Sequence, residues 1–217
     1  MAVTEKVICV VGPTATGKTK MGVALAQRFD GEVVSVDSMQ IYRGMAVGTA
    51  APTPEEMEGV PHHMIGVADP WESWSAARFT EAADACVQDI LRRGRRPILV
   101  GGTGLYLDAL LRGIDFAAGS QDTPLRRQLQ ERLRREGAEA LLEELRRIDP
   151  DGAARLHLRD EKRILRALEV YQETGETITQ HDRRTREQPP RYEGLFIGLN
   201  FQDRQDLRDR IDRRVDD

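Results

Sequence analysis

Cysteine, aromatic residues and long apolar runs are all scarce in this chain of 217 residues. The two cysteines, Cys9 and Cys86, stand far apart in apolar surroundings, which argues against a disulfide framework and favours a reducing compartment. The longest apolar runs, such as Val7–Val11 and Ile98–Val100, are far shorter than the roughly 20 residues of a membrane-spanning helix. The first residues show no signal-peptide pattern. We therefore expect a cytoplasmic protein that does not enter a membrane.

Lysine is scarce as well, because only four of the 32 basic residues are lysines and the others are arginines. Arginine favours bidentate contacts with phosphate and carboxylate groups, although genome composition alone is the simpler explanation of the bias. The formal net charge of −4 argues against a general nucleic-acid binder. With 40% hydrophobic residues the chain can bury a core, which excludes a disordered protein.

The first part of the chain alternates between strand and helix patterns. Apolar, β-branched runs over Lys6–Val11 and Glu32–Val36 predict two strands, and the pattern between them predicts a helix over Lys18–Arg28. This order of strand, loop, helix and strand is typical of a parallel α/β sheet.

The alternation continues after a long irregular stretch. Residues 44–70 are rich in Gly, Pro and Thr and are expected to form loops. Ser75 is the expected N-cap of a helix that runs to about Arg93. Pro97–Val100 then predicts a third strand, followed by a short helix.

The hydrophobic pattern of the sequence changes near residue 121, where strand patterns stop and leucines recur at helical spacing. A strand pattern returns only at Gly194–Asn200. We therefore expect an α/β core of the P-loop NTPase type, with a parallel sheet, that is interrupted by an all-helical insertion domain. The expected bounds are 1–120 for the core, 121–193 for the insertion and 194–217 for the return to the core.

The strongest motif follows the first strand. The sequence GPTATGKT matches the P-loop pattern G-x-x-x-x-G-K-[ST], and it has the required strand before it and helix after it. Such a loop cradles phosphate oxygens with backbone N–H groups at the positive end of a helix. Lys18 would add a charge to the phosphates, and the hydroxyl of Thr19 would bind Mg²⁺. The expected diphosphate or nucleotide site comprises Gly12, Pro13, Thr14, Ala15, Thr16, Gly17, Lys18 and Thr19.

A P-loop does not by itself identify the reaction. In P-loop NTPases an acid at the end of another strand helps to hold Mg²⁺, but the third strand here ends in Gly101-Gly102. The second strand ends in Asp37, which is therefore a candidate for the metal-side acid or for a general base. A structural turn or N-cap is the alternative role of Asp37.

Five segments along the chain together resemble one family. They are GPTATGKT at 12–19, DSMQIY at 37–42, PHHM at 61–64, GGTGLY at 101–106 and RILRALEV at 163–170. On these segments the chain resembles the tRNA dimethylallyltransferases, also called tRNA isopentenyltransferases. DSxQxY combined with GGTGLY is far more specific to this family than the P-loop is.

The resemblance implies transfer of a dimethylallyl group from dimethylallyl diphosphate to the exocyclic amino nitrogen of the adenine beside the tRNA anticodon. The P-loop would then hold the diphosphate leaving group. Asp37 would take the proton from the amino group, and Thr103 and Arg126 match catalytic-site positions of the family. Residues expected to contact the tRNA are Asp37, Ser38, Met39, Gln40, Glu161, Lys162, Arg163, Ile164 and Leu165.

This chemistry suits the residue types. The amino nitrogen of adenine is a poor nucleophile until a base accepts its proton, and fixed donors with Mg²⁺ can stabilise the leaving diphosphate. The expected partners are the tRNA anticodon stem-loop and dimethylallyl diphosphate, and the expected protein is a monomer. Three alternatives stay open: an ATP-dependent small-molecule kinase, an adenylate isopentenyltransferase, and an inactive RNA-binding fragment. Members of the family continue beyond the length of this chain, so we expect the C-terminal part of their fold to be missing here.

Other conspicuous residues have plainer interpretations. His62-His63 lacks further metal ligands at suitable spacing and is expected to be structural. Trp71 and Trp74 are expected to cover the edge of the core. Arginines at the end of a helix are expected to be solvated there: Arg92, Arg93, Arg95 and Arg96. A second arginine cluster near the end of the insertion is open to RNA-backbone contacts: Arg183, Arg184, Arg186 and Arg191.

Overall fold

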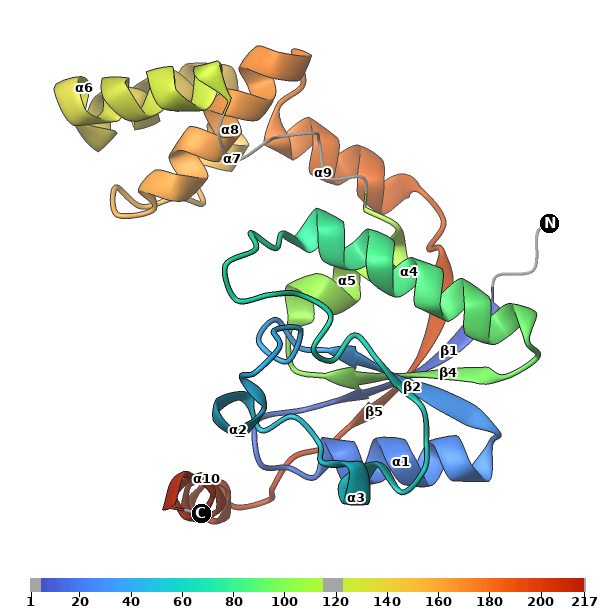
Figure 1. Ribbon diagram of the computed structural model, residues 1–217. Coiled ribbons are helices and arrows are strands. Elements are labelled where there is room, and N and C mark those ends of the chain that lie inside the picture. The colour runs from blue at the N-terminus through green and yellow to red at the C-terminus, as the bar shows by residue number, and fades with distance from the viewer. Residues whose placement is uncertain (1–4, 115–122, 217) are drawn as a thin grey trace. The chain divides into compact units, whose positions relative to one another are not determined.

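The computed structural model describes residues 5–114 and 123–216 and divides into two compact units (Figure 1). A core unit combines residues 1–114 with 190–217, and a helical unit comprises residues 115–189. The boundary expected between residues 120 and 121 lies outside the described residues. Within those residues, no helix is both long enough and apolar enough to cross a membrane.

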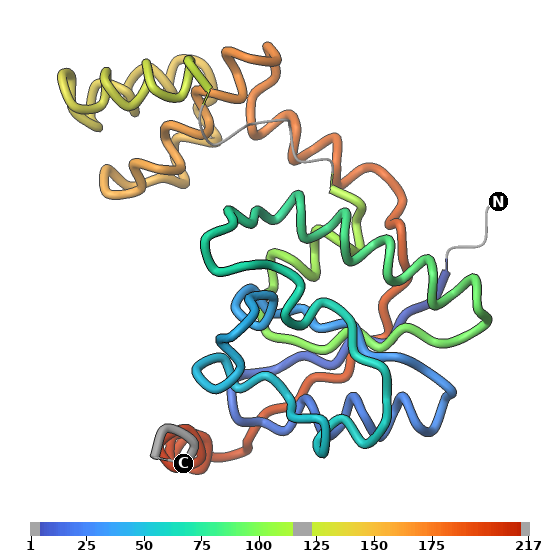
Figure 2. Tube along the Cα trace, viewed as in Figure 1, coloured from blue at the N-terminus to red at the C-terminus, as the bar shows by residue number. Residues whose placement is uncertain are grey.

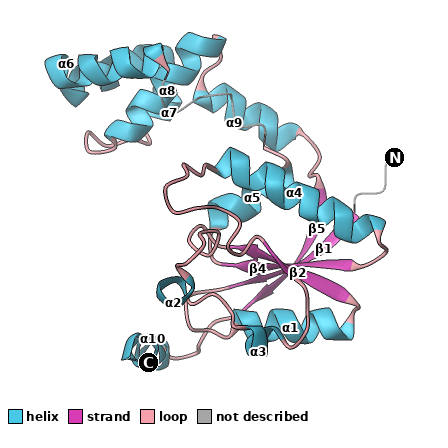
Figure 3. Ribbon diagram, in the orientation of Figure 1, coloured by secondary structure: helices cyan, strands magenta, loops and turns pink. Residues whose placement is uncertain are grey.

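The core unit is built on one parallel sheet of five strands in the order β3-β2-β4-β1-β5 (Figure 3). The strands are β1 (Glu5–Val11), β2 (Gly31–Val36), β3 (His62–His63), β4 (Arg96–Gly101) and β5 (Tyr192–Gly198). All four pairings are parallel, so the carboxyl ends of the strands share one edge. In such sheets the ligand site lies at this edge.

Helices cover both faces of the sheet, with α4 and α5 on one face and α1 and α3 on the other (Figure 1). The helices of the core unit are α1 (Lys18–Arg28), α2 (Ala46–Thr49), α3 (Pro54–Met57), α4 (Ala76–Arg92), α5 (Gly104–Arg112) and α10 (Arg204–Asp216). The P-loop-like parallel α/β fold expected from the sequence is thus confirmed, and the helix over Lys18–Arg28 has the expected bounds. Ser75 caps α4 by accepting a hydrogen bond from the N–H of Arg78.

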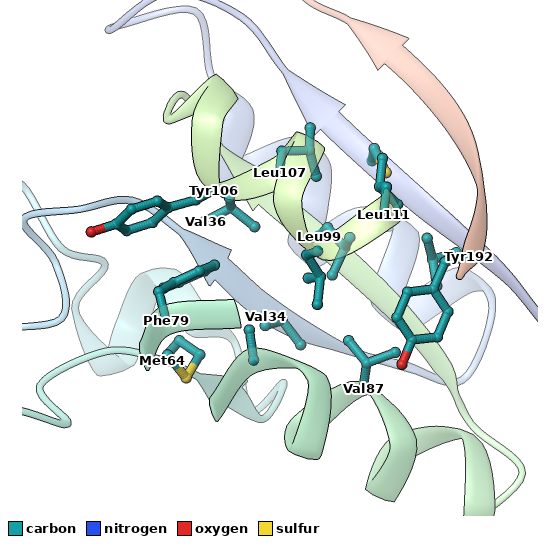
Figure 4. Close-up of a cluster of buried hydrophobic side chains, with 14 of the residues drawn as sticks. Val34, Val36, Met64, Phe79, Val87, Leu99, Tyr106, Leu107, Leu111 and Tyr192 are labelled. Carbon is teal, nitrogen blue, oxygen red and sulfur yellow. The ribbon is translucent and has the colours of Figure 1, made fainter. Parts of the chain in front are cut away.

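Alternate side chains of the strands supply the two halves of the core. On β1, Val7 and Cys9 belong to the cluster beneath α4 and α5, while Val10 packs with α1 on the opposite face. Figure 4 shows the first of these clusters, in which Phe79 of α4 and Tyr106 of α5 stack with their ring centroids 4.3 Å apart. Burial raises the pKa of the Cys9 thiol to about 12, which keeps it protonated and inert.

The helical unit has a leucine-rich core of its own. Its helices are α6 (Pro124–Ile148), α7 (Pro150–Ala153), α8 (Glu161–Thr174) and α9 (Ile178–Glu187). Leu129, Leu145 and Leu168 are among the side chains buried between α6 and α8. Gly137 interrupts α6 with a left-handed φ of 83°, and this lets two helical segments fold back on each other.

The stretch expected to be a loop is more structured than the sequence indicated. Residues 44–70 contain the one-turn helices α2 and α3 and the edge strand β3. Figure 2 traces this part of the chain, which passes α3 beside α1 before it forms β3. Threonine and proline together start α3, because Thr53 closes a capping box with Glu56 and Pro54 is the first helical residue.

The last strand begins two residues earlier than expected. Tyr192 opens β5 and is fully buried, and its hydroxyl donates to Asp84 at 2.6 Å and accepts from Gln88 at 2.7 Å. Arg191, immediately before it, makes two 2.5 Å bonds to the carboxylate of Asp84. Polar bonds to α4 therefore fix the start of the strand, where the sequence shows no apolar run.

Candidate functional site

The glycine-rich loop at residues 12–19 connects β1 to α1 at the carboxyl edge of the sheet. Gly17 is the N-cap of α1 and has a left-handed φ of 86°, which only glycine adopts without strain. A side chain at Gly12 would collide with the carbonyl oxygen of Leu199, just beyond β5. The loop is therefore held close to the sheet, with the positive end of α1 behind it.

Side chains of the loop bond to its own backbone. Lys18 donates from Nζ to the carbonyl oxygen of Pro13 at 2.7 Å, and Thr16 donates from Oγ1 to the same oxygen at 2.9 Å. A phosphate group placed in the loop would compete with this oxygen for the ammonium group. The bond thus keeps Lys18 folded over the loop, where a phosphate would lie.

A cavity of about 840 Å³ opens in front of the loop. Thr14, Lys18 and Thr19 line one side, and Asp37, from the turn after β2, lines it as well. The sequence placed these residues on two separate segments, and the parallel sheet brings them to one cavity, because the turns after β1 and β2 lie at the same carboxyl edge.

The turn after β2 is organised by Asp37. Its Oδ1 atom accepts hydrogen bonds from the backbone N–H groups of Met39 at 2.8 Å and of Gln40 at 3.3 Å. This is an Asx turn, which fixes the carboxylate against its own backbone. The turn role that the sequence left open for Asp37 is therefore present, and it coexists with the position of Asp37 on the cavity.

Gln40 connects this turn to α2. Its Oε1 atom accepts from the hydroxyl of Ser35 at 2.8 Å, and its Nε2 atom donates to the carbonyl oxygen of Ala50 at 3.2 Å. Both ends of the amide are thus used within the protein. The neighbouring Met39 is largely exposed, with 46% of its surface open to solvent, so it is accessible to a ligand.

Thr103 lies beside the same turn. Its Oγ1 atom accepts a hydrogen bond of 3.1 Å from the N–H of Ser38, and its own N–H donates to the carbonyl oxygen of Val36 at 3.2 Å. Thr103 is also the N-cap of α5. The GGTG sequence can approach so closely because Gly101 lacks a side chain, which would collide with the backbone of Val36.

The remaining expected site residues belong to the helical unit. Arg126 on α6 donates to Glu169 on α8 at 3.0 Å, and Glu169 is buried. At the start of α8, Ile164 and Leu165 are buried in the leucine-rich core. The exposed side chains of this stretch are those of Glu161, Lys162 and Arg163.

The sequence did not indicate that α2 and α10 border the cavity. Ala46 and Val47 of α2 line it, and so do Arg210 and Arg213 of α10. The two arginines are three residues apart and therefore share one face of the helix, but that spacing alone does not show what the face meets.

The histidine pair is structural, as expected. His62 bonds through Nδ1 to the carbonyl oxygen of Val60, and His63 lies 2.7 Å from the buried carboxylate of Glu32. Burial is the main cause that lowers the pKa of His62, which favours its neutral form. Over the part of the chain that the structure describes, no group of three or more His, Cys, Asp or Glu side chains could hold a metal.

Part of the arginine-rich helix end is not simply solvated. Arg93 and Arg95 both bond to Glu32, and their bonds and that of His63 neutralise a carboxylate that is only 2% exposed. In the second arginine cluster, Arg191 bonds Asp84 and Arg184 bonds Glu176. These pairings give Arg93, Arg95 and Arg191 structural roles within the core unit, and they give Arg184 one within the helical unit.

The two tryptophans differ in their exposure to solvent. Trp74 packs against the core, with the guanidinium of Arg78 4.2 Å from its ring centroid. Trp71, in contrast, is 83% exposed, so the expectation that it covers the core edge is wrong. The turn at Asp69–Glu72 holds it outward: the N–H of Glu72 bonds the carbonyl oxygen of Asp69, and Arg43 and Arg78 pair with the two acids.

A five-stranded parallel sheet with a glycine-rich loop after its first strand defines an α/β protein of the P-loop type. Comparison with known proteins narrows this class. The IPP transferase family profile matches residues 40–217, and the isopentenyl transferase profile matches residues 5–65. The chain belongs to the IPP transferase family.

Curated relatives and solved structures lead to the same family. The chain is 49% identical over 212 residues to tRNA dimethylallyltransferase 1 of Pelobacter propionicus, covering 97% of this chain and 68% of that protein. It is similar to the crystal structure of a full-length tRNA isopentenylpyrophosphate transferase from Bacillus halodurans, with 45% identity, a TM-score of 0.65 and coverage of 98% and 65%. A eukaryotic dimethylallyltransferase described as acting on tRNA matches with 33% identity, a TM-score of 0.82 and coverage of 98% and 53%. The chain thus spans about two thirds of the length of the curated relatives that it matches.

Proposed function

We propose that the protein transfers a dimethylallyl group from dimethylallyl diphosphate to the exocyclic amino nitrogen of the adenine 3′-adjacent to the anticodon in tRNA. One observation carries this proposal: the glycine-rich loop and Asp37 line the same cavity. A loop suited to a diphosphate and a carboxylate suited to a proton acceptor are the two groups that this reaction requires. The names of the relatives supply the substrates.

In this reaction the bond between the allylic carbon and the diphosphate oxygen breaks, and a carbon–nitrogen bond forms. The electron pair leaves with the diphosphate, whose charge the backbone N–H groups of the loop, the α1 terminus and Lys18 would stabilise. Because Lys18 already lies over the loop, it would exchange the Pro13 oxygen for a phosphate oxygen. The loop residues 12–19 thus serve as the diphosphate site.

Asp37 is the proposed proton acceptor. The adenine amino nitrogen gains nucleophilicity as its proton moves to the carboxylate, and the two backbone bonds to Oδ1 hold that carboxylate in position. Thr103 supports the same turn through Ser38. The adenine must leave its stack to reach the cavity, and this costs a few kcal/mol that contacts with the rest of the RNA offset. Ser38, Met39 and Gln40 continue the turn that would face the base.

Mg²⁺ fits the residues of this site. The Thr19 hydroxyl and the Asp37 carboxylate are oxygen donors on the cavity, and Mg²⁺ commonly takes one or two protein oxygens, with phosphates and water completing its shell. When bound, the ion would supply positive charge to the leaving diphosphate.

The helical unit is the proposed holder of the RNA. Glu161, Lys162 and Arg163 begin α8 with exposed side chains that could contact the stem-loop, whereas Ile164 and Leu165 could contribute only through their backbone. Arg126 would contribute indirectly, by holding Glu169 through their hydrogen bond, unless the substrate takes the place of Glu169 as its acceptor. A cytoplasmic monomer is consistent with this assignment.

The test is a prenyl-transfer assay with an anticodon stem-loop and dimethylallyl diphosphate. We expect transfer by the unsubstituted chain, and a loss of at least a hundredfold in Asp37→Asn, which keeps the shape but cannot accept the proton. Asp108→Asn is the matched control, because Asp108 is exposed, bonds its own helix neighbour Arg112 and lies off the cavity. Equal loss in both variants, or no transfer at all, would contradict the proposal.

Adding ATP and AMP to the same assay separates the alternatives. Phosphoryl transfer from ATP would indicate a small-molecule kinase, and prenylation of AMP in preference to the stem-loop would indicate an adenylate isopentenyltransferase. Stem-loop binding without turnover of any substrate would indicate an RNA-binding fragment.

A further inference from the structure

Trp71 lies in the connection from β3 to α4, which belongs to the same edge of the sheet as the cavity. β3 and β4 are both parallel to β2, and α4 follows β3 in the chain, so this connection starts from the carboxyl end of a strand. Figure 1 shows that α4 begins at the end of the sheet at which α1 also begins. The glycine-rich loop, the turn of Asp37 and the turn of Trp71 are therefore all at this edge of the core unit.

Backbone hydrogen bonds join this connection to the segment that follows Asp37. The N–H of Ala68 donates to the carbonyl oxygen of Ile41 at 2.9 Å, and the carbonyl oxygen of Ala68 accepts from the N–H of Arg43 at 2.8 Å. Together these bonds make an isolated parallel bridge. Trp71 follows Ala68 by only three residues. A polynucleotide that has one base at Asp37 can therefore reach Trp71 with a flanking nucleotide.

Charged side chains hold the turn that carries Trp71. Arg43 pairs with Asp69 at 2.8 Å, and Arg78 pairs with Glu72 at 2.6 Å. The arginines are the more exposed partners, with 55% and 47% of their side chains open to solvent against 33% and 28% for the acids. Each guanidinium has five N–H donors, more than its acid occupies. An indole that is 83% exposed is thus combined with two guanidinium groups that can still donate to a ligand.

An exposed aromatic ring with arginines on the same turn suits single-stranded RNA, whose unpaired bases stack on aromatic side chains while guanidinium groups meet the phosphates. An adenine that leaves its stack deprives the neighbouring base of a stacking partner, and a ring at the same edge of the protein can replace it. The bonded turn favours this role further, because little conformational freedom is lost when the ring binds.

We propose that Trp71 is a stacking platform for an unpaired nucleotide next to the modified adenine, with Arg43 and Arg78 donating to its phosphates. This inference rests on the proposed function. It adds an RNA contact to the core unit beyond the turn of Asp37, and it gives a role to an indole that does not serve the core. A double helix presents no free base faces, so the platform distinguishes a loop from a stem.

Equilibrium binding of an anticodon stem-loop to the full chain tests the platform without requiring turnover. Trp71→Ala should weaken this binding about tenfold, the loss expected when one stack between a base and an aromatic ring is removed. Trp71→Phe keeps an aromatic plane and should bind within about threefold of the unsubstituted chain. A blunt RNA duplex with the sequence of the stem should bind equally to all three proteins. The dissociation constant for inorganic diphosphate should also be unchanged, which reports that the glycine-rich loop is intact.

Phe29→Ala is the matched control. Phe29 is an aromatic side chain of the same unit that is 50% exposed, and the guanidinium of Arg28 lies 5.7 Å from its ring centroid. Because Phe29 is the C-cap of α1, it lies at the opposite edge of the sheet from Trp71. Its removal should leave stem-loop binding unchanged.

The proposal is overturned if the unsubstituted chain does not bind the stem-loop, if Trp71→Ala binds it just as tightly, if Trp71→Phe binds it as weakly as Trp71→Ala, or if stem-loop and duplex lose affinity equally. Self-association of the chain that Trp71→Ala abolishes, with RNA binding unchanged, would overturn it too and assign the indole to a protein contact. Absence of prenyl transfer with the Trp71-dependent binding retained would instead refute the proposed function and keep the RNA site.

Discussion

The Oγ1 atom of Thr103 accepts a 3.1 Å hydrogen bond from the backbone N–H of Ser38, which joins two turns 65 residues apart in the sequence. The bond connects the turn after β4 to the turn after β2 at the shared edge of the sheet. Since Ser38 follows Asp37 directly, the orientation of the carboxylate depends on a hydroxyl from another strand. Thr103 is therefore a positioning residue in the proposed reaction, whether or not it also touches substrate.

Replacing Thr103 with valine tests whether Thr103 acts by positioning the turn that carries Asp37. The variant keeps the shape but leaves the Ser38 N–H without its acceptor, which costs about 1 kcal/mol of stability. We expect the rate of transfer to fall about tenfold as Asp37 moves, with the dissociation constant for inorganic diphosphate unchanged. Thr103→Ser retains the acceptor and should restore the rate. A rate that is equally low in both variants would contradict a positioning role.

Two glycines of GGTG, Gly101 and Gly104, should respond in opposite ways to substitution by alanine. A Cβ atom at Gly101 would collide with the backbone of Val36, so Gly101→Ala must push β4 and β2 apart. We expect a loss of about 3 kcal/mol in the free energy of unfolding. Gly104 begins α5 and has open space around it, so Gly104→Ala should be neutral or slightly stabilising, because alanine favours helix.

Urea denaturation of both glycine variants can be followed by tryptophan fluorescence, because both tryptophans belong to the core unit. Equal destabilisation by the two substitutions would show that the motif tolerates no side chain at either position, contrary to the packing.

The glycine-rich loop and the strands β1, β2 and β4 were predictable because their signals are contiguous. The segment at 12–19 combines its motif with a strand and a helix on either side, and periodicity alone gave the bounds of α1. The pairing of Thr103 with Ser38 was not predictable in the same way, because no local pattern states which distant turns meet. The resemblance placed both near the site, but only the parallel register brings them together.

Other features were missed because their residues have ordinary local explanations. Val47 and Ala50 stand in a Gly- and Thr-rich stretch that indicated a loop, and the bond from Gln40 that shapes α2 is not visible in sequence. Trp71 and Trp74 have similar sequence contexts. Trp71 nevertheless lies in a turn whose acids, Asp69 and Glu72, are paired with arginines, whereas Trp74 packs on the core. Burial of Glu32 was equally hidden, since its three partners come from two later segments.

Glu32 should make stability depend on pH. The hydrogen bond from Arg93 is the largest cause that holds the pKa of Glu32 well below its usual range; bonds from Arg95 and His63 act in the same direction, and burial opposes them. Because the pKa is lower in the folded state, the stabilisation is fully present above about pH 4.5, the ordinary value, and is lost as the pH falls below it.

Glu32→Gln should therefore cost about 2 kcal/mol at pH 7 and less at pH 3, where protonation of Glu32 in the unfolded chain already lowers the stability of the unsubstituted protein. Urea denaturation at a series of pH values would measure this as a flatter pH dependence in the variant. Asp89→Asn is a suitable control, because Asp89 pairs with Arg92 and Arg93 at an exposed position and should have little effect. Parallel curves for Glu32→Gln and the unsubstituted protein would contradict the role assigned to Glu32.

The two tryptophans offer a matched pair for a final prediction. Trp74 packs on the core beneath Arg78, so Trp74→Ala removes both apolar contact and a cation–π interaction and should cost about 2 kcal/mol. Trp71 is 83% exposed, and the bonds that shape its turn come from Asp69 and Glu72 rather than from its own ring. Trp71→Ala should consequently leave the melting temperature within about 1 °C of the unsubstituted protein, because substitutions at such exposed positions change stability little. Thermal unfolding followed by circular dichroism distinguishes the two, and a lower melting temperature in Trp71→Ala would mean that the indole packs against the protein after all.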